Sequence, residues 1–106
     1  KGCDEENIVK AAEEFGFKGY VKQNSSINEV KKLVKKGIPV IVDWFSPEEA
    51  GHYSVVVGFD KDKIILADPH FGEIKKHKIE WFEERWFDLP FGKKGPLLKE
   101  IIVIHQ

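Results

Sequence analysis

The chain has 106 residues, with 17 Lys or Arg and 18 Asp or Glu, which gives a formal net charge of −1. This length suits one small domain with one core. The balanced, interspersed charges give no electrostatic case for binding nucleic acid or an anionic membrane. No apolar run approaches the roughly 20 residues that span a bilayer, and no signal-peptide pattern is present. Cys3 is the only cysteine, which excludes an intrachain disulfide.

The first third of the chain predicts two helices. Residues 4–15 carry apolar side chains at helical spacing and acidic residues in the first turn, and a glycine follows. A short extended stretch is expected at 18–23. Ser26 is typical of an N-cap, and Glu29, three positions later, predicts a capping box. The second helix is expected over residues 27–36, and a glycine ends it as well.

The remainder of the chain predicts mostly strands. Residues 38–45 form an apolar, β-branched run that is typical of a buried central strand. The elements expected after it are a loop at 46–51, a hairpin at 52–69, a strand at 74–79, aromatic helical turns at 79–87, a loop at 89–97 and a closing strand at 100–105. Helices followed by antiparallel strands indicate an α+β fold, with the two N-terminal helices packed on an antiparallel sheet.

The hairpin at 52–69, HYSVVVGFDKDKIILADP, carries a titratable group at each end. His52 opens its first strand and Asp68 closes its second. An antiparallel hairpin folds its two ends toward each other, so an imidazole and a carboxylate could meet at one edge of the sheet. The His52 face of the first strand carries small side chains that another element could approach, and the face of Tyr53 and Phe59 is expected to be core.

The pairing register decides whether His52 and Asp68 can meet. A plain two-residue turn at 61–62 with unbroken pairing puts Asp68 on the face opposite His52. A loop with an odd number of residues, or one bulge, returns both side chains to the same face. A His–Asp pair therefore requires one extra residue in the register of this hairpin.

Such a pair would have specific chemistry. A carboxylate that accepts the Nδ1–H of an imidazole fixes the tautomer and raises the basicity of Nε2. The imidazole can then take a proton from a nearby thiol or hydroxyl and return it to a leaving group. The same residues also fit a simpler structure, in which His52 is exposed at a strand end and Asp68 caps an Asp-Pro turn.

The hairpin resembles the histidine half of papain-like cysteine peptidases. It is most similar to the bacterial branch that cleaves the leader peptides of exported bacteriocins after a double glycine. The strand at 38–42, the segment 79–86 and the helix that ends at 15–17 resemble flanking elements of that family. The residues that carry the resemblance are a His with an aromatic neighbour, a β-branched run ending in Gly, and Asp-Pro: His52, Tyr53, Val55, Val56, Val57, Gly58, Asp68 and Pro69.

The resemblance implies a peptide substrate and thiol-dependent hydrolysis of a peptide bond through a thioester, with no cofactor. It also implies that His52 is the general base and that Asp68 orients it. The family's nucleophile is a Cys followed by Gly at the start of a long helix, with a Gln upstream that helps to form the oxyanion hole, and this sequence contains neither motif. A helix N-terminus would favour a Cys3 thiolate, but the three acidic residues that follow disfavour it. We interpret Cys3 as an incidental thiol.

Two accounts of the missing motif remain. In one, residues 1–106 are a single domain that forms the C-terminal part of a papain-like peptidase domain, inactive without the nucleophile segment. In the other, the domain kept the fold without the Cys, and it binds peptides or a partner protein without cutting them. Both accounts predict an apolar patch that is either exposed or covered by the missing segment or by a second copy of the chain.

Four residues near the hairpin are of metal-ligating types, namely His52, Asp68, His70 and His77. No paired Cys and no His-Glu-x-x-His pattern supports zinc, so we predict no metal site. His77 lies among three lysines and is expected to be solvated. Trp44 is expected to be core rather than the wall of a substrate groove.

Overall fold

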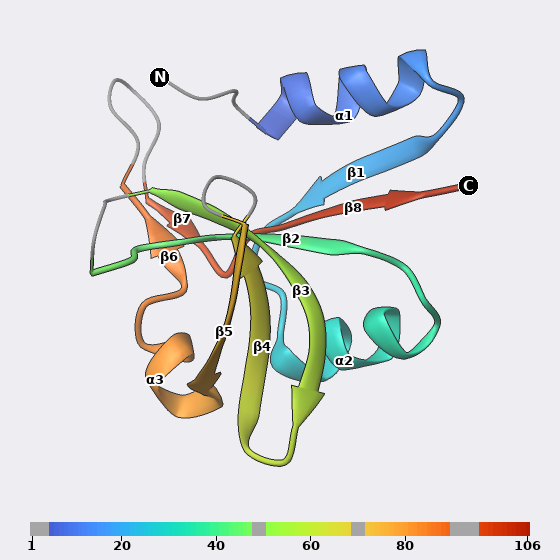
Figure 1. Ribbon diagram of the computed structural model, residues 1–106. Helices are drawn as coiled ribbons and strands as arrows, with labels where there is room; N and C mark the ends of the chain where they lie inside the picture. Colours follow the sequence, from blue (N-terminus) through green and yellow to red (C-terminus); the bar gives the residue numbers. More distant parts are fainter. Residues whose placement is uncertain (1–4, 48–50, 69–71, 90–95) are drawn as a thin grey trace.

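The computed structural model describes residues 5–47, 51–68, 72–89 and 96–106. Most elements lie within two residues of their predicted bounds (Figure 1). The elements are α1 (Glu5–Glu14), β1 (Lys18–Lys22), α2 (Ile27–Lys35), β2 (Val40–Trp44), β3 (His52–Asp60), β4 (Lys63–Asp68), β5 (Glu73–Lys78), α3 (Ile79–Glu83), β6 (Phe87–Asp88), β7 (Leu97–Leu98) and β8 (Ile101–His105).

Six strands form one antiparallel sheet in the order β1-β8-β2-β3-β4-β5, and β6 pairs with β7 in a separate two-stranded sheet. The described part of the chain is therefore α+β, as predicted. The β6–β7 pair differs from the prediction, which placed helical turns up to residue 87 and a loop over 89–97. α3 instead ends at Glu83, and the two short strands pair only through contacts distant in the sequence.

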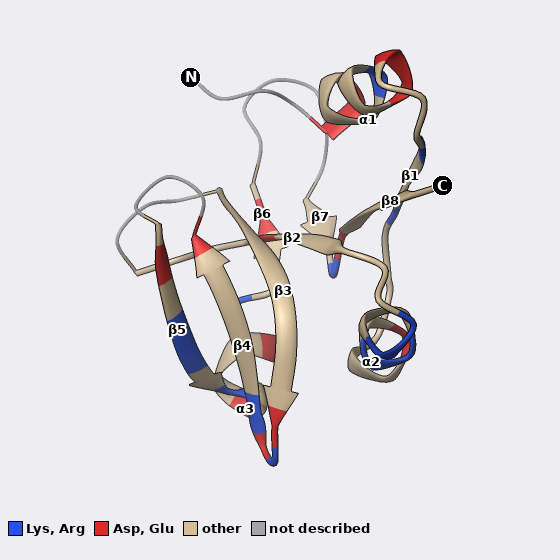
Figure 2. Cartoon of the chain, turned by 45° about the vertical axis from the view of Figure 1, so that its right-hand side comes forward, with Lys and Arg blue, Asp and Glu red and all other residues tan. Residues whose placement is uncertain are grey.

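The helices lie on both sides of the large sheet (Figures 1 and 2). α1 packs on β1 and β8, where Val9 and Ile104 close around Gly19. On the other side α2 packs on β2 and β3, and α3 packs on β4 and β5. The main core lies on this second side and consists of Ile27, Val30, Val40, Val42, Trp44, Val56, Ile64, Leu66, Phe82, Trp86, Ile101 and Val103. Among the described residues, no helix is long and apolar enough to cross a membrane.

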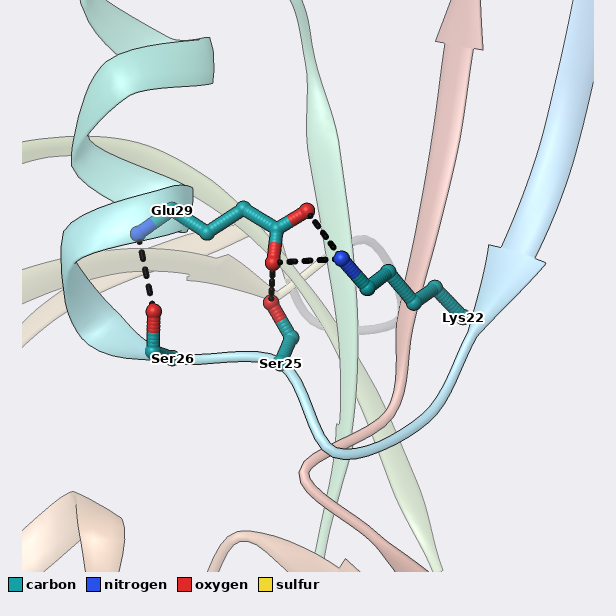
Figure 3. A network of polar contacts seen from close by, with 4 residues as sticks. All are labelled: Lys22, Ser25, Ser26 and Glu29. Atoms are coloured by element: carbon teal, nitrogen blue, oxygen red, sulfur yellow. Dashed lines mark hydrogen bonds and ion pairs between the residues drawn. The ribbon is translucent and has the colours of Figure 1, made fainter.

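The start of α2 confirms one half of the predicted capping box. The backbone N–H of Glu29 donates to Oγ of Ser26 at 3.1 Å, which makes Ser26 the N-cap. The Glu29 carboxylate does not turn back to the N-cap. It accepts hydrogen bonds from the Ser25 hydroxyl at 2.9 Å and from the Lys22 ammonium at 2.9 and 3.0 Å (Figure 3). The Lys22 hydrogen bond, and then that of Ser25, lower the pKa of Glu29.

The two faces of β3 are the reverse of the prediction. His52, Ser54 and Val56 are buried on the side of α2 and α3, whereas Tyr53 is only half-buried on the other side. Phe59 does pack against the core, but it reaches the core on the His52 side. The small face of β3 therefore meets the core directly, because the large Trp and Phe side chains of neighbouring elements fill the space in front of it.

The opposite face of the sheet carries an apolar row with no described helix over it. Ile41, Val55, Ala67 and Ile74 pair with one another across β2, β3, β4 and β5. α1 contacts only β1 and β8, so among the described elements this row has no covering layer. Ile74 is 68% exposed. β3 carries no Lys, Arg, Asp or Glu before its last residue, Asp60 (Figure 2). The apolar patch expected from the sequence is present here only in part, because Ile41, Val55 and Ala67 are half-buried and Ile74 alone in this row is exposed.

Candidate functional site

The hairpin contains the extra residue that a His–Asp pair requires. β3 and β4 are joined by a two-residue turn at 61–62. The register then shifts between Val56 and Gly58, and Val57 has no opposite residue on β4. A β-bulge of this kind moves all later residues of the strand to the other face. The prediction of an extra residue is confirmed, and the form it takes is a bulge rather than an odd-numbered loop.

As a consequence, His52 and Asp68 share a face and are in contact. Nε2 of His52 lies 2.9 Å from Oδ2 of Asp68, and the two side chains are 9% and 18% exposed. The simpler structure, with His52 exposed at a strand end, is therefore wrong. The short distance and the low exposure make this a strong, charge-assisted contact between an imidazole N–H and a carboxylate.

The nitrogen that meets the carboxylate differs from the expected one. The last pair of the hairpin is Val55 with Ala67, so Asp68 lies level with Ser54, two residues short of His52. The imidazole has to reach along the strand, and its remote nitrogen, Nε2, closes that distance. When Nε2 carries the proton donated to Asp68, the lone pair of the neutral ring is on Nδ1. In that tautomer the basic atom of the ring is Nδ1.

Trp44 helps to fix the His52 ring. The two rings meet edge to face with centroids 5.9 Å apart and an interplanar angle of 79°. The indole N–H of Trp44 donates to the buried hydroxyl of Ser54 at 3.0 Å, which holds the indole in one orientation. Trp44 is 4% exposed and belongs to the core, as predicted, and it also forms one wall of a cavity.

This cavity lies beside the His–Asp pair and has a volume of about 260 Å³. Aromatic and aliphatic side chains contribute much of its lining, and the catalytic candidates form one side. Its lining residues are Trp44, Ser46, Pro47, His52, Ser54, Leu66, Asp68, Lys75, His77 and Trp81. A larger cavity of about 410 Å³ lies elsewhere, between α1, β1 and β7, and its described lining contains neither a histidine nor a thiol.

His77 is part of the aromatic wall and is half-buried, whereas the prediction had it solvated. Its ring stacks on Trp81 with centroids 4.6 Å apart and an interplanar angle of 19°. The guanidinium of Arg85 lies 4.2 Å from the centre of the Trp81 ring and also donates to the Trp81 carbonyl at 3.0 Å. The alternation along β5 explains the error, because His77 points to the core face while its immediate neighbours, Lys76 and Lys78, point away.

The opposite face holds a feature that the sequence did not predict. Asp43 is 1% exposed on β2, and neither of its carboxylate oxygens has a hydrogen-bond donor within the described residues. Burial, and then the neighbouring carboxyl of Asp88, raise the pKa of Asp43 to about 9. Burial and the same carboxyls also raise the pKa of Tyr53. A lone acid inside the apolar run at 38–45 was the available sequence signal.

Gly51 lies against the carboxyl of Asp88 and directly precedes His52, the first residue of β3. It adopts a φ of +68°, and a Cβ at this position would lie 2.9 Å from Oδ1 of Asp88. Only glycine takes up this conformation and this contact without strain. The residue immediately ahead of His52 is therefore packed against the carboxyl of Asp88.

Two candidates of the sequence analysis, Cys3 and His70, lie outside the described residues, as does Pro69. Within the residues that the structure describes, no group of three or more His, Cys, Asp or Glu side chains is arranged to hold a metal ion. The site consists of an imidazole, a carboxylate and an aromatic cavity beside them.

Comparison with known proteins identifies the family of this chain. Residues 1–92 match the model of the Peptidase_C39 like family. The chain is 36% identical over 81 residues to the transport/processing ATP-binding protein ComA of two Streptococcus pneumoniae strains, across 74% of this chain and 11% of those proteins. Its fold matches the crystal structure of the peptidase domain of Streptococcus mutans ComA with a TM-score of 0.68 and 20% identity, over 100% of this chain and 80% of that one. The chain belongs to the Peptidase_C39 like family.

Proposed function

We propose that this chain supplies the general base and its orienting carboxylate to a cysteine-type peptidase. The observation that carries the proposal is the 2.9 Å contact between Nε2 of His52 and Asp68, two side chains that a bulge brings to one face. Membership of a peptidase-like family and a fold shared with a peptidase domain support a peptide as the substrate.

The proposed hydrolysis uses the tautomer of His52 in which Nε2 carries the proton and Nδ1 accepts one from a thiol or from water. Nδ1 of His52 takes the proton of a cysteine thiol, and the carboxylate of Asp68 stabilises the imidazolium that forms. The thiolate attacks the scissile carbonyl, and Nδ1–H then gives its proton to the departing amine as the thioester forms. Water attacks the thioester carbonyl while Nδ1 of His52 takes a proton from the water. As the C–S bond breaks, Nδ1–H gives that proton to the departing thiolate, and the carboxylic acid product is released. Asp68 remains a carboxylate throughout and keeps Nδ1 directed at the reacting atoms.

We infer that the nucleophile comes from a segment outside residues 1–106. No thiol is present among the described residues, and the acidic run after Cys3 disfavours a thiolate there. The curated relatives are far longer, since this chain matches only 11% of their length. A leader peptide cleaved after a double glycine is the substrate that the resemblance implies.

The test uses the full-length protein and a leader-type peptide. His52→Ala is expected to lower kcat/KM by a factor of about 10² to 10⁴, because the base is lost. His105→Ala removes a half-buried histidine at the end of β8, outside the cavity, and is the matched control. Full activity of His52→Ala, with His105→Ala equally active, would overturn the proposal.

A second candidate is a module that binds peptides without cutting them. The cavity beside His52 favours it, because an aromatic cavity can hold a peptide side chain whether or not a nucleophile is present. A thiol-reactive probe separates the two candidates in the full-length protein. Labelling of one cysteine at a rate that falls in His52→Ala supports the peptidase, whereas peptide binding without any reactive cysteine supports the binding module.

A further inference from the structure

The cavity beside the His–Asp pair has the size of a subsite rather than of a whole ligand site. Ligand pockets for drug-sized molecules run from roughly 300 to 1,000 Å³, and this cavity measures about 260 Å³. The same space lies in contact with His52 and Asp68, which form one of its sides. A group that enters it is therefore close to the reacting atoms.

One part of the cavity wall is flat and aromatic. Trp44 and Trp81 meet edge to face with ring centroids 5.9 Å apart, and His77 stacks on Trp81. Leu66, which is 3% exposed, adds an aliphatic surface. Aromatic rings favour offset-stacked or edge-to-face neighbours, so this lining suits another planar ring.

The walls are also held in place by polar contacts. Trp44 is fixed through its N–H to the Ser54 hydroxyl at 3.0 Å. Trp81 is fixed by the ring of His77 and by the guanidinium of Arg85, which also bonds the Trp81 carbonyl. A cavity whose walls are already ordered loses little conformational entropy when a ligand side chain enters it.

The charged side chains that line the cavity limit which kind of substrate side chain can enter it. The cavity contains both a cation, Lys75, and an anion, Asp68, which is engaged with His52. A cationic side chain would compete with His52 for Asp68. An anionic one would be desolvated against Trp44 and Trp81 and would compete with Glu73 for Lys75, whose Nζ lies 3.5 Å from Oε1 of Glu73. A neutral, planar side chain meets neither cost.

We propose that this cavity is a specificity subsite that receives a neutral aromatic side chain, Phe or Tyr, from a residue of the peptide near the scissile bond. The assignment rests on the proposed peptidase or peptide-binding function, and it adds the substrate class that the site selects. Trp81 and His77 are the specificity-determining residues, and Trp44 is a positioning residue for both His52 and the subsite.

The first experiment measures selectivity in the full-length protein. Peptides that differ only by Phe or Ala at each position around the cleavage site give a ratio of kcat/KM values. At one position we expect Phe to exceed Ala by about tenfold or more, and Trp81→Ala to reduce that ratio to near unity. Tyr20→Ala removes an exposed aromatic residue on β1, outside the cavity, and should leave the ratio unchanged. His77→Ala gives a second disruption of the subsite if Trp81→Ala fails to fold.

The second experiment does not depend on cleavage. N-Acetylphenylalanine amide at millimolar concentration should shift the indole N–H signals of Trp44 and Trp81 in NMR spectra, and N-acetylalanine amide should not. Shifts without any peptide cleavage would refute the peptidase function and leave the subsite standing. Cleavage that depends on His52 but shows no aromatic preference at any position, with no indole shifts, would refute the subsite and leave the peptidase function standing.

Discussion

Val57 determines the face on which Asp68 lies. The bulge at Val57 comes between Val56, which pairs with Leu66, and Gly58, which pairs with Ile65, and it compensates for the even-numbered turn at the tip of the hairpin. Without it Asp68 would point toward the uncovered face, away from His52. An exposed valine with no catalytic chemistry therefore controls whether the imidazole has its carboxylate.

Deletion of Val57 should abolish the His52–Asp68 contact. The shorter strand restores unbroken pairing and rotates either His52 or the buried side chains of β4 to the wrong face, so we also expect a loss of stability. Val57→Ala keeps the chain length and changes a 48% exposed side chain, so its cost should stay within about 0.5 kcal/mol. Cross-strand NMR contacts between His52 and Asp68 should persist in Val57→Ala. If they also persist in the deletion variant, the bulge does not set the register.

Removal of the Asp68 carboxylate should allow His52 to populate both neutral tautomers. With Asp68 present, the proton of the neutral ring belongs on Nε2, and long-range ¹⁵N–¹H NMR spectra should show that form. Asp68→Ala removes the acceptor and should give a mixture of the two tautomers. Asp68→Asn keeps an oxygen acceptor in nearly the same shape and is the matched control. A dominant Nδ1–H form in the unsubstituted protein would contradict the assignment of Nδ1 as the base.

Local patterns in the sequence carried much of the fold. The hairpin, the Ser26 N-cap and the strand that ends at Trp44 were predictable because their signals lie within a few residues. The pairing of His52 with Asp68 was predictable only as a condition on the register. The sequence shows no sign of which residue is bulged, because any position between the two could have supplied the shift.

The remaining features depend on tertiary contacts. β6 and β7 each have two residues and exist because distant segments meet. The buried face of β3 belongs to the same core as Phe82 and Trp86, which come from a distant part of the sequence. The use of Nε2 rather than Nδ1 follows from the stagger of Asp68 along the strand, which no spacing rule contains.

Asp43 should make the protein less stable as the pH rises. Its pKa is raised by burial and by Asp88 from 3.8 to about 9. Between those two values the folded state holds a proton that the unfolded chain has released, so the free energy of unfolding falls as pH rises through this window. A full proton of difference would give a slope of about 1.4 kcal/mol per pH unit. Asp43→Asn removes the titration, so urea unfolding between pH 5 and pH 8.5 should show a flatter slope.

Asp60→Asn is the control for that experiment. Asp60 is exposed and its hydrogen bond with Lys76 lowers its pKa, so its titration lies below the window. The pH slope of Asp60→Asn should match that of the unsubstituted protein. An unchanged slope in Asp43→Asn would show that this buried acid is not the group that links stability to pH.

The hydrogen bond from Trp44 to Ser54 should be measurable by a double-mutant cycle. Trp44→Phe leaves the Ser54 hydroxyl buried without its donor, and Ser54→Ala leaves the indole N–H buried without its acceptor. Each change should cost about 1 to 3 kcal/mol in the free energy of unfolding. The double variant should cost less than the sum, since it leaves neither polar group behind. If the free energies of unfolding, measured by circular dichroism, show that the two single-variant costs simply add in the double variant, the two side chains do not interact.

The contact of Gly51 with Asp88 has a practical consequence for anyone who redesigns this domain. A replacement loop, a tag or a cross-linker placed ahead of β3 has to retain glycine at this position, because any other side chain would collide with the carboxyl and resist the left-handed backbone. The part of the chain that can be replaced therefore ends two residues before His52, ahead of Gly51. A graft that keeps Gly51 leaves its close approach to the Asp88 carboxyl intact, next to the first residue of β3.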